Sequence, residues 1–127
     1  MGLSGSQVES TIAVSDIDRA KEFYEGKLGL SGGEDGVDGG RTYPCGGGTK
    51  IHVYPSPDNA GKSGATLAAF LVQDVGQTVD ELTAAGVKFE QYGEPFNTDD
   101  KGIARMGDEA IAWFKDPDGN TLAIGNQ

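Results

Sequence analysis

The chain has very few of the residues that build disulfides, metal sites and membrane spans. Its 127 residues include one cysteine and one histidine. The single Cys45 excludes a disulfide within the chain and agrees with a reducing compartment. No apolar run approaches the roughly 20 residues that span a bilayer, and the first residues lack the basic and apolar regions of a secretory signal. We therefore expect a cytoplasmic protein that has no membrane partner.

Basic residues are scarce as well. Ten lysines and arginines stand against twenty acidic residues, which gives a formal net charge of −10. A surface this negative repels phosphate backbones, so it argues against nucleic acid as a partner. The same charge suits either simple solubility or a cationic ligand, and charge alone does not choose between them.

The first half of the chain begins with the pattern of a strand and a helix. Residues 8–14 alternate in part between apolar and polar side chains, as a half-buried strand does. Ser15 then suits the N-cap of a helix, with Asp18 reinforcing the cap, and Gly29 suits the left-handed conformation that ends a helix. Short extended runs at 41–45 and 50–54 predict further strands.

The second half repeats this order of elements. Residues 66–72 predict a strand, and helical spacing follows from Asp74 to a stop at Gly86. Further strands are predicted at 88–92, 103–106, 110–115 and 121–124, the last two joined by a tight turn. We therefore expect one α+β domain over residues 1–127, made of two similar modules at 8–56 and 65–126.

Two phrases of the sequence resemble the vicinal oxygen chelate superfamily of glyoxalases, bleomycin resistance proteins and dihydroxybiphenyl dioxygenases. The first runs from Ile12 to Ile17 and on through Ala20 to Leu30, and the second covers 112–124. The resemblance implies two βαβββ modules whose curved sheets enclose a cleft, and a homodimer. Members include glyoxalase I, extradiol dioxygenases, fosfomycin-resistance transferases, epimerases and metal-free proteins that sequester bleomycin or mitomycin. The fold alone therefore does not give the activity.

The resemblance also points to four positions at which the family's enzymes hold a metal. In this chain they fall on Glu9, His52, Leu67 and Ala123. The last two side chains cannot bind a metal, whereas a stable site needs three or more donors. Because His52 is the only histidine, one chain cannot build a site of two histidines and one carboxylate. We expect neither a metal nor another cofactor.

Alternation along the strands predicts which side chains face the helices. If Glu9 and His52 point into the cleft, the residues next to them in each strand point the other way. The set that then faces the helices is almost wholly aliphatic or aromatic: Ile12, Val14, Ile51, Val53, Phe70, Val72, Leu122 and Ile124. A shift of one residue would bury the polar set instead, which supports this register.

The opposite set predicts the lining of a small-molecule cleft. Tyr43 joins it from a neighbouring strand, Phe96 from the irregular segment 93–102, and either Trp113 or Phe114 from the last hairpin. Core packing is an equally suitable role for these aromatic residues. The ligand-binding residues that we expect are Glu9, Thr11, Tyr43, Lys50, His52, Tyr54, Leu67, Phe96, Trp113 and Ala123.

These residues favour a small-molecule binding or sequestering protein without a complete metal site. The alternative is an enzyme of the lyase, isomerase or dioxygenase kind, in which His52 and Glu9 act as a metal-free acid–base pair. A third hypothesis is an interaction subunit that kept the fold and lost the site. The sequence does not identify the small organic ligand.

Overall fold

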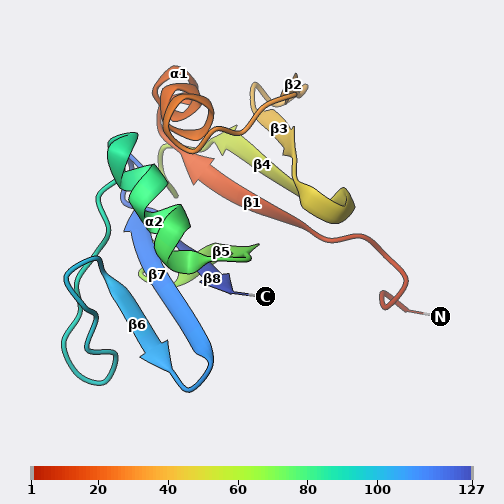
Figure 1. Ribbon diagram of the computed structural model, residues 1–127. Helices are drawn as coiled ribbons and strands as arrows, with labels where there is room; N and C mark the ends of the chain where they lie inside the picture. Colours follow the sequence, from red (N-terminus) through yellow and green to blue (C-terminus); the bar gives the residue numbers. More distant parts are fainter. Residues whose placement is uncertain (1, 127) are drawn as a thin grey trace.

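The computed structural model describes residues 2–126 (Figure 1). Met1 and Gln127, which belong to the domain expected over 1–127, lie outside the described residues. The strands are β1 (Glu9–Val14), β2 (Glu34–Asp35), β3 (Arg41–Pro44), β4 (Lys50–Pro55), β5 (Thr66–Val72), β6 (Ile103–Met106), β7 (Glu109–Lys115) and β8 (Thr121–Asn126). The helices are α1 (Ile17–Lys21), continued by a π-helical segment (Glu22–Lys27), a 3-10 turn (Gly46–Gly48) and α2 (Val75–Ala84).

The strands form two sheets of the same design. The N-terminal sheet has the order β1-β4-β3-β2 and the C-terminal sheet the order β5-β8-β7-β6. In each sheet the first strand of the module pairs in parallel with its last strand, and the remaining pairs are antiparallel. The α+β class and the two βαβββ modules predicted from the sequence are confirmed.

The two helices begin in similar ways. Asp16 is the N-cap of α1, and its Oδ1 accepts hydrogen bonds from the backbone N–H groups of Asp18 and Arg19. The prediction that Ser15 caps this helix was wrong, because the Ser15 hydroxyl bonds Asp118 of the other module instead. Helix α2 begins as predicted, since the Asp74 side chain accepts from the backbone N–H of Gln77.

Both helices end at a glycine, as predicted. Gly29 and Gly86 have φ angles of 77° and 100°, a left-handed conformation that a residue with a Cβ adopts only at an energetic cost. Each glycine therefore turns the chain out of its helix.

The strands of the structure differ from the predicted strands in two places. Segment 88–92 forms no strand, and only Phe89 bridges to Phe114, because the N–H of Tyr92 bonds Thr98 within its own loop. Strand β2 was not predicted, since it has two residues within a glycine-rich segment.

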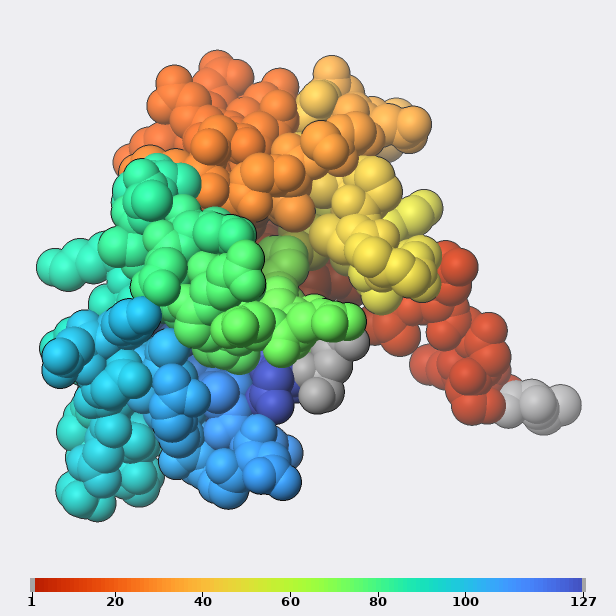
Figure 2. Space-filling model, in the orientation of Figure 1, coloured from red at the N-terminus to blue at the C-terminus, as the bar shows by residue number. Residues whose placement is uncertain are grey.

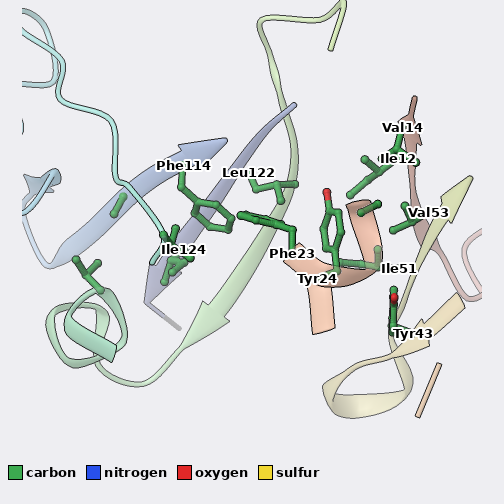
Figure 3. Close-up of a cluster of buried hydrophobic side chains, with 14 of the residues drawn as sticks. Ile12, Val14, Phe23, Tyr24, Tyr43, Ile51, Val53, Phe114, Leu122 and Ile124 are labelled. Carbon is green, nitrogen blue, oxygen red and sulfur yellow. The ribbon is translucent and has the colours of Figure 1, made fainter. Parts of the chain in front are cut away.

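One apolar core lies between the two sheets. In Figure 3 the buried side chains of both sheets point toward Phe23 and Tyr24, which lie between them. The Phe23 ring packs against Phe114 of β7 with centroids 6.2 Å apart. The predicted helix-facing residues of β1, β4 and β8 are all buried here. Each sheet thus turns its apolar face to the shared core and its other face outward; we call these the outer faces.

A polar cluster ties the last hairpin to the first module. Buried Asp116 accepts hydrogen bonds from the Tyr24 hydroxyl, the Asn120 side chain and two backbone N–H groups of the turn. Asn120 also donates to the carbonyl of Ala13 at the end of β1. Burial, followed by the nearby Asp116 charge, raises the pKa of Tyr24, so its hydroxyl stays a donor.

Candidate functional site

The outer face of the N-terminal sheet carries a row of polar side chains. Thr11, His52 and Thr42 are register partners on β1, β4 and β3. They point away from the core because their neighbours in the strands, Ile12 and Val53, are buried in it. Of the residues expected to bind ligand, this face carries Glu9, Thr11, Lys50, His52 and Tyr54.

Both ring nitrogens of His52 have hydrogen-bond partners. Nε2 lies 2.7 Å from Oδ2 of Asp38, and Nδ1 lies 2.7 Å from Oγ1 of Thr42. The hydrogen bond with His52 lowers the pKa of Asp38, with a second contribution from the N–H of Gly40. Asp38 is therefore an ionised acceptor, which makes Nε2 the donor. In this arrangement the remaining lone pair, on Nδ1, accepts a hydrogen bond from the Thr42 hydroxyl, so neither nitrogen is open to a further group.

The carboxylate that orients His52 is Asp38, whereas Glu9 was expected in that role. Glu9 lies opposite Lys50 at the start of β1, two register pairs before the pair of Thr11 and His52. Asp38 reaches His52 from the turn between β2 and β3. Sequence reasoning missed Asp38 and Thr42 because the glycine-rich segment around them shows no register that would align them with His52.

Tyr54 and Tyr43 take opposite roles. The Tyr54 ring stacks on His52, with centroids 6.0 Å apart and planes within 6°. Tyr43 is a register partner of buried Ile51 and belongs to the core, so it does not lie on the outer face where ligand contact was expected. Its hydroxyl donates to Glu25, and this bond together with the Arg41 charge lowers the pKa of Glu25.

The outer face of the C-terminal sheet carries an aromatic cluster. Trp113 contacts Phe96 at 4.9 Å and Tyr92 at 5.4 Å between ring centroids. Ala123 and Ala104 complete the floor under these rings. Trp113 faces outward and Phe114 faces the core, which settles the choice that strand alternation left open. Trp113 is 8% exposed and Phe96 is 39% exposed, so Phe96 is the more accessible of these two rings.

Leu67 does not join this outer face. The register of β5 shifts between Thr66 and Ala68, so Leu67 is the extra residue of a bulge. Its half-buried side chain packs against the main core. Alternation predicted an outward direction, but a bulge changes the side to which a residue points.

A cavity lies in the seam between the two sheets. Its volume is about 620 Å³, and it is bounded by the start of β1, by residues 45–51 and by residues 68–72 of β5. Of the residues expected to bind ligand, Lys50 lines this cavity. In Figure 2 the red start of β1, the yellow turn and green β5 approach one another around this seam.

The residues present do not fit the metal site of the family's enzymes. Glu9 and His52 belong to the N-terminal sheet, whereas Leu67 and Ala123 belong to the C-terminal sheet and offer no donor. Within residues 2–126, no three histidine, cysteine or acidic side chains are grouped closely enough to hold a metal ion. Across the same residues, no helix has the length and apolar character that crossing a membrane requires.

Comparison with known proteins agrees with this fold. The model of the Glyoxalase/Bleomycin resistance protein/Dioxygenase superfamily matches residues 7–124, which confirms the resemblance found in the sequence. The antibiotic binding protein TnmS3 from Streptomyces sp. CB03234 is 25% identical, with a TM-score of 0.69 over 99% of this chain and 98% of that one. None of the curated proteins compared with the chain matches it.

Two further solved structures have the same fold. A glyoxalase/bleomycin resistance protein from Streptomyces sp. CB03234 is 25% identical, with a TM-score of 0.66 over 94% of this chain and 98% of that one. A lactoylglutathione lyase from Agrobacterium tumefaciens is 17% identical, with a TM-score of 0.69 over 96% of this chain and 93% of that one. The lyase shares the fold, and this identity says nothing about activity.

Proposed function

The chain belongs to the glyoxalase, bleomycin resistance protein and dioxygenase superfamily, and from this membership we propose that it binds a small organic molecule without transforming it. The observation that carries the proposal is the state of His52. Its two ring nitrogens are engaged by Asp38 and Thr42, so the chain's only histidine is held as a structural donor and acceptor. An acid–base catalyst needs a nitrogen that can exchange a proton with the substrate.

The ligand that fits the outer faces is planar and aromatic. One face presents the stacked rings of His52 and Tyr54, and the other presents Phe96 above Trp113. Aromatic rings favour offset-stacked or edge-to-face contact with other rings. TnmS3 is described as an antibiotic binding protein, and this supports an antibiotic-like molecule as the ligand.

We further propose that two chains complete each site. The outer faces of one chain lie on opposite sides of the shared core (Figure 3), so one ligand does not touch both within a chain. In a homodimer, the N-terminal outer face of one chain lies opposite the C-terminal outer face of its partner. Each of the two sites then contains His52 and Tyr54 from one chain and Phe96 and Trp113 from the other.

Fluorescence titration tests ligand binding directly, because Trp113 is the only tryptophan. A panel of planar aromatic antibiotics should include compounds that change Trp113 emission in a saturable way. Phe96→Ala should weaken that binding about tenfold by removing a stacking ring. Leu3→Ala, a change at an exposed residue that precedes β1, serves as the control.

Recovery of the bound compound distinguishes binding from catalysis. Mass spectrometry should find the ligand unchanged after prolonged incubation with the protein. A product that forms with wild-type protein and disappears with His52→Ala would support the enzyme alternative instead.

Subunit complementation tests the shared site. Tyr54→Ala and Trp113→Ala chains carrying different tags are co-expressed, and the heterodimer is purified. If sites form between chains, both changes fall in one site and the other is intact, so calorimetry finds one ligand per dimer at wild-type affinity. If each site lies within one chain, the heterodimer has no intact site and binds as weakly as either variant alone.

A further inference from the structure

The polar row on the outer face of the N-terminal sheet has a fixed pattern of hydrogen-bond donors and acceptors. It runs from Thr11 on β1 through His52 on β4 to Thr42 on β3, and Asp38 reaches it from the turn before β3. The role of each group beside His52 follows from the charge of Asp38.

Asp38 is an ionised carboxylate that the protein leaves without a lysine or arginine partner. Its hydrogen bonds with His52 and with the N–H of Gly40 lower its pKa. Within residues 2–126 it pairs with no lysine or arginine, and its side chain is 46% exposed. A carboxylate has about four lone-pair sites, and these two bonds use only two of them. Asp38 therefore keeps acceptor capacity for a group that arrives from solvent.

The charge of Asp38 also fixes the direction of the next hydrogen bond. Because Nε2 of His52 donates to Asp38, Nδ1 of the neutral ring carries a lone pair. Nδ1 lies 2.7 Å from Oγ1 of Thr42, and two acceptors repel each other at that distance, so the Thr42 hydroxyl donates. A hydroxyl has a single proton. Thr42 therefore offers only lone pairs to a ligand.

Gly36 lets the turn before β3 hold Asp38 this close to His52. A Cβ at Gly36 would lie 2.9 Å from Oδ1 of Asp38 and 3.4 Å from Cε1 of His52. The first separation is shorter than a carbon normally approaches an oxygen, so a side chain at Gly36 would push the carboxylate away. The bond from the N–H of Gly40 holds the carboxylate in place. The position of the acceptor is thus set by the turn itself.

The other polar groups of this face do not oppose that pattern. The hydroxyls of Thr11 and Tyr54 can each rotate to donate or to accept. Lys50 is a donor, but it lies at the start of β4 with the acidic Glu9 as its register partner. The groups that impose a direction beside the His52 ring are therefore the acceptors Asp38 and Thr42.

Building on the proposed function, we propose that the planar ligand carries a hydrogen-bond donor at its edge, a hydroxyl or an amine, and that Asp38 and Thr42 are the acceptors. A ligand whose edge offers only a carbonyl meets lone pairs there and loses its hydrogen bonds to water without replacement. The charge of Asp38 makes a hydrogen bond to it about twice as strong as a neutral one. The edge group therefore decides which planar aromatic molecules bind tightly.

Three pyrenes that share one planar ring system test this preference. 1-Hydroxypyrene and 1-pyrenemethylammonium carry a neutral and a cationic donor, whereas 1-acetylpyrene carries an acceptor. Fluorescence anisotropy at pH 7 gives the Kd of each probe. The hydroxyl probe should bind wild-type protein about tenfold more tightly than the acetyl probe, as expected for one hydrogen bond to a charged group. If only the cationic probe exceeds the acetyl probe, attraction by the net charge of −10 is sufficient and the proposal is wrong.

Asp38→Asn should abolish the preference by reversing the hydrogen bonds. The N–H of Gly40 requires an acceptor, so the amide oxygen takes the place of Oδ1 and the amide nitrogen donates to Nε2. The ring proton then moves to Nδ1 and bonds Thr42, whose own proton becomes available to a ligand. The acetyl probe should therefore bind as tightly as the hydroxyl probe. Asp18→Asn removes the same charge from α1, which packs on the opposite face of the sheet, and should keep the tenfold preference.

Nitrogen NMR of the imidazole ring tests the reversal without any ligand. His52 is the only histidine, so protein without a histidine tag gives one pair of ring signals, and their shifts distinguish an N–H from a lone pair. Wild-type protein should carry the proton on Nε2, and Asp38→Asn should carry it on Nδ1. A wild-type ring with its proton on Nδ1 alone overturns the proposal.

The outcomes distinguish the polar edge from the proposed function. If the hydroxyl and acetyl probes bind wild-type protein equally, the proposal is wrong, whereas binding of planar aromatic molecules stands. A folded Asp38→Asn protein that keeps the wild-type preference also overturns the proposal. If the amide variant fails to fold, Asp38→Ala decides in the same way, because it removes the charged acceptor outright. If no pyrene binds, the proposed function fails together with the proposal.

Discussion

The hydroxyl of Tyr24 donates a hydrogen bond to Oδ2 of Asp116 over 2.8 Å, between residues 92 positions apart in the chain. Tyr24 belongs to the helical segment of the first module, and Asp116 begins the turn between β7 and β8. Asn120 extends the contact to β1. These bonds hold the modules with their apolar faces toward each other, and that orientation turns the two outer faces apart.

Replacing Tyr24 by phenylalanine should destabilise the protein by about 1–3 kcal/mol. The change removes one of the partners of buried Asp116 and leaves that carboxylate less satisfied. Urea denaturation followed by circular dichroism gives the free energy of unfolding. Tyr43→Phe is the matched control, because the Tyr43 hydroxyl bonds a carboxylate of Glu25 that water reaches. If both variants lose the same free energy of unfolding, the bond to buried Asp116 stabilises the protein no more than the bond to Glu25 does.

His52→Ala should raise the pKa of Asp38 toward its ordinary value of 3.8. The hydrogen bond with His52 is the largest cause of the lowered pKa in the wild type. Because the folded pKa is lowered, the stabilisation is complete above the ordinary value and is lost as pH falls through the lower folded value. Titration of the Asp38 side-chain carboxyl signal by NMR measures its pKa in the wild type and in the variant.

Asp99 provides the internal reference for that titration. Its pKa is lowered mainly by the backbone N–H of Ile103, which His52→Ala does not alter. Its titration should coincide in both proteins. An unchanged Asp38 titration in the variant would show that His52 does not hold this carboxylate.

Phe96→Ala should expose Trp113 to solvent. The Phe96 ring lies 4.9 Å from Trp113 between centroids, and Trp113 is 8% exposed with the ring in place. Tryptophan emission should shift to longer wavelength, and quenching by acrylamide should increase about twofold or more. Met106→Ala, at an exposed residue of β6, should leave both unchanged. Identical quenching in Phe96→Ala would mean that other residues shield the indole.

Alkylation of Cys45 should require higher pH than that of an ordinary thiol. Burial raises the pKa of Cys45 above its ordinary value of 9.0, and the thiolate is the form that reacts. The rate of reaction with iodoacetamide, measured from pH 7 to 11, should reach half its maximum above pH 9.0. A midpoint at or below pH 9.0 would show that burial does not raise the pKa of the Cys45 thiol.

Local patterns were sufficient for much of the fold. Asp74 and Gly86 bound α2 as predicted, because a cap and a left-handed glycine act within a few residues. The Ser15 cap was wrong for a nonlocal reason, since Asp118 takes its hydroxyl from the other module. Strand alternation correctly assigned Ile12 and Val53 to the core.

The candidate site was less predictable, because its partners come from several strands and turns. Tyr43 was expected to line the cleft, but the register of β3 on β4 places Thr42 beside His52 and turns Tyr43 into the core. A bulge redirected Leu67 in the same way. Register between strands depends on turn geometry and cannot be read from the alternation within one strand.

The sequence by itself determined the resemblance to the family, the repeat of strand, helix and further strands in each half, and the apolar faces of β1, β4 and β8. Motifs and alternation act within a few residues of the chain, so they can be read from the sequence. Only the tertiary structure decided that Asp38 holds His52, that Phe96 covers Trp113 and that the outer faces lie apart. It also placed a cavity between Lys50 and β5. The physical reason is that each of these arrangements depends on how loops and modules pack in space, and residue spacing carries no record of that packing.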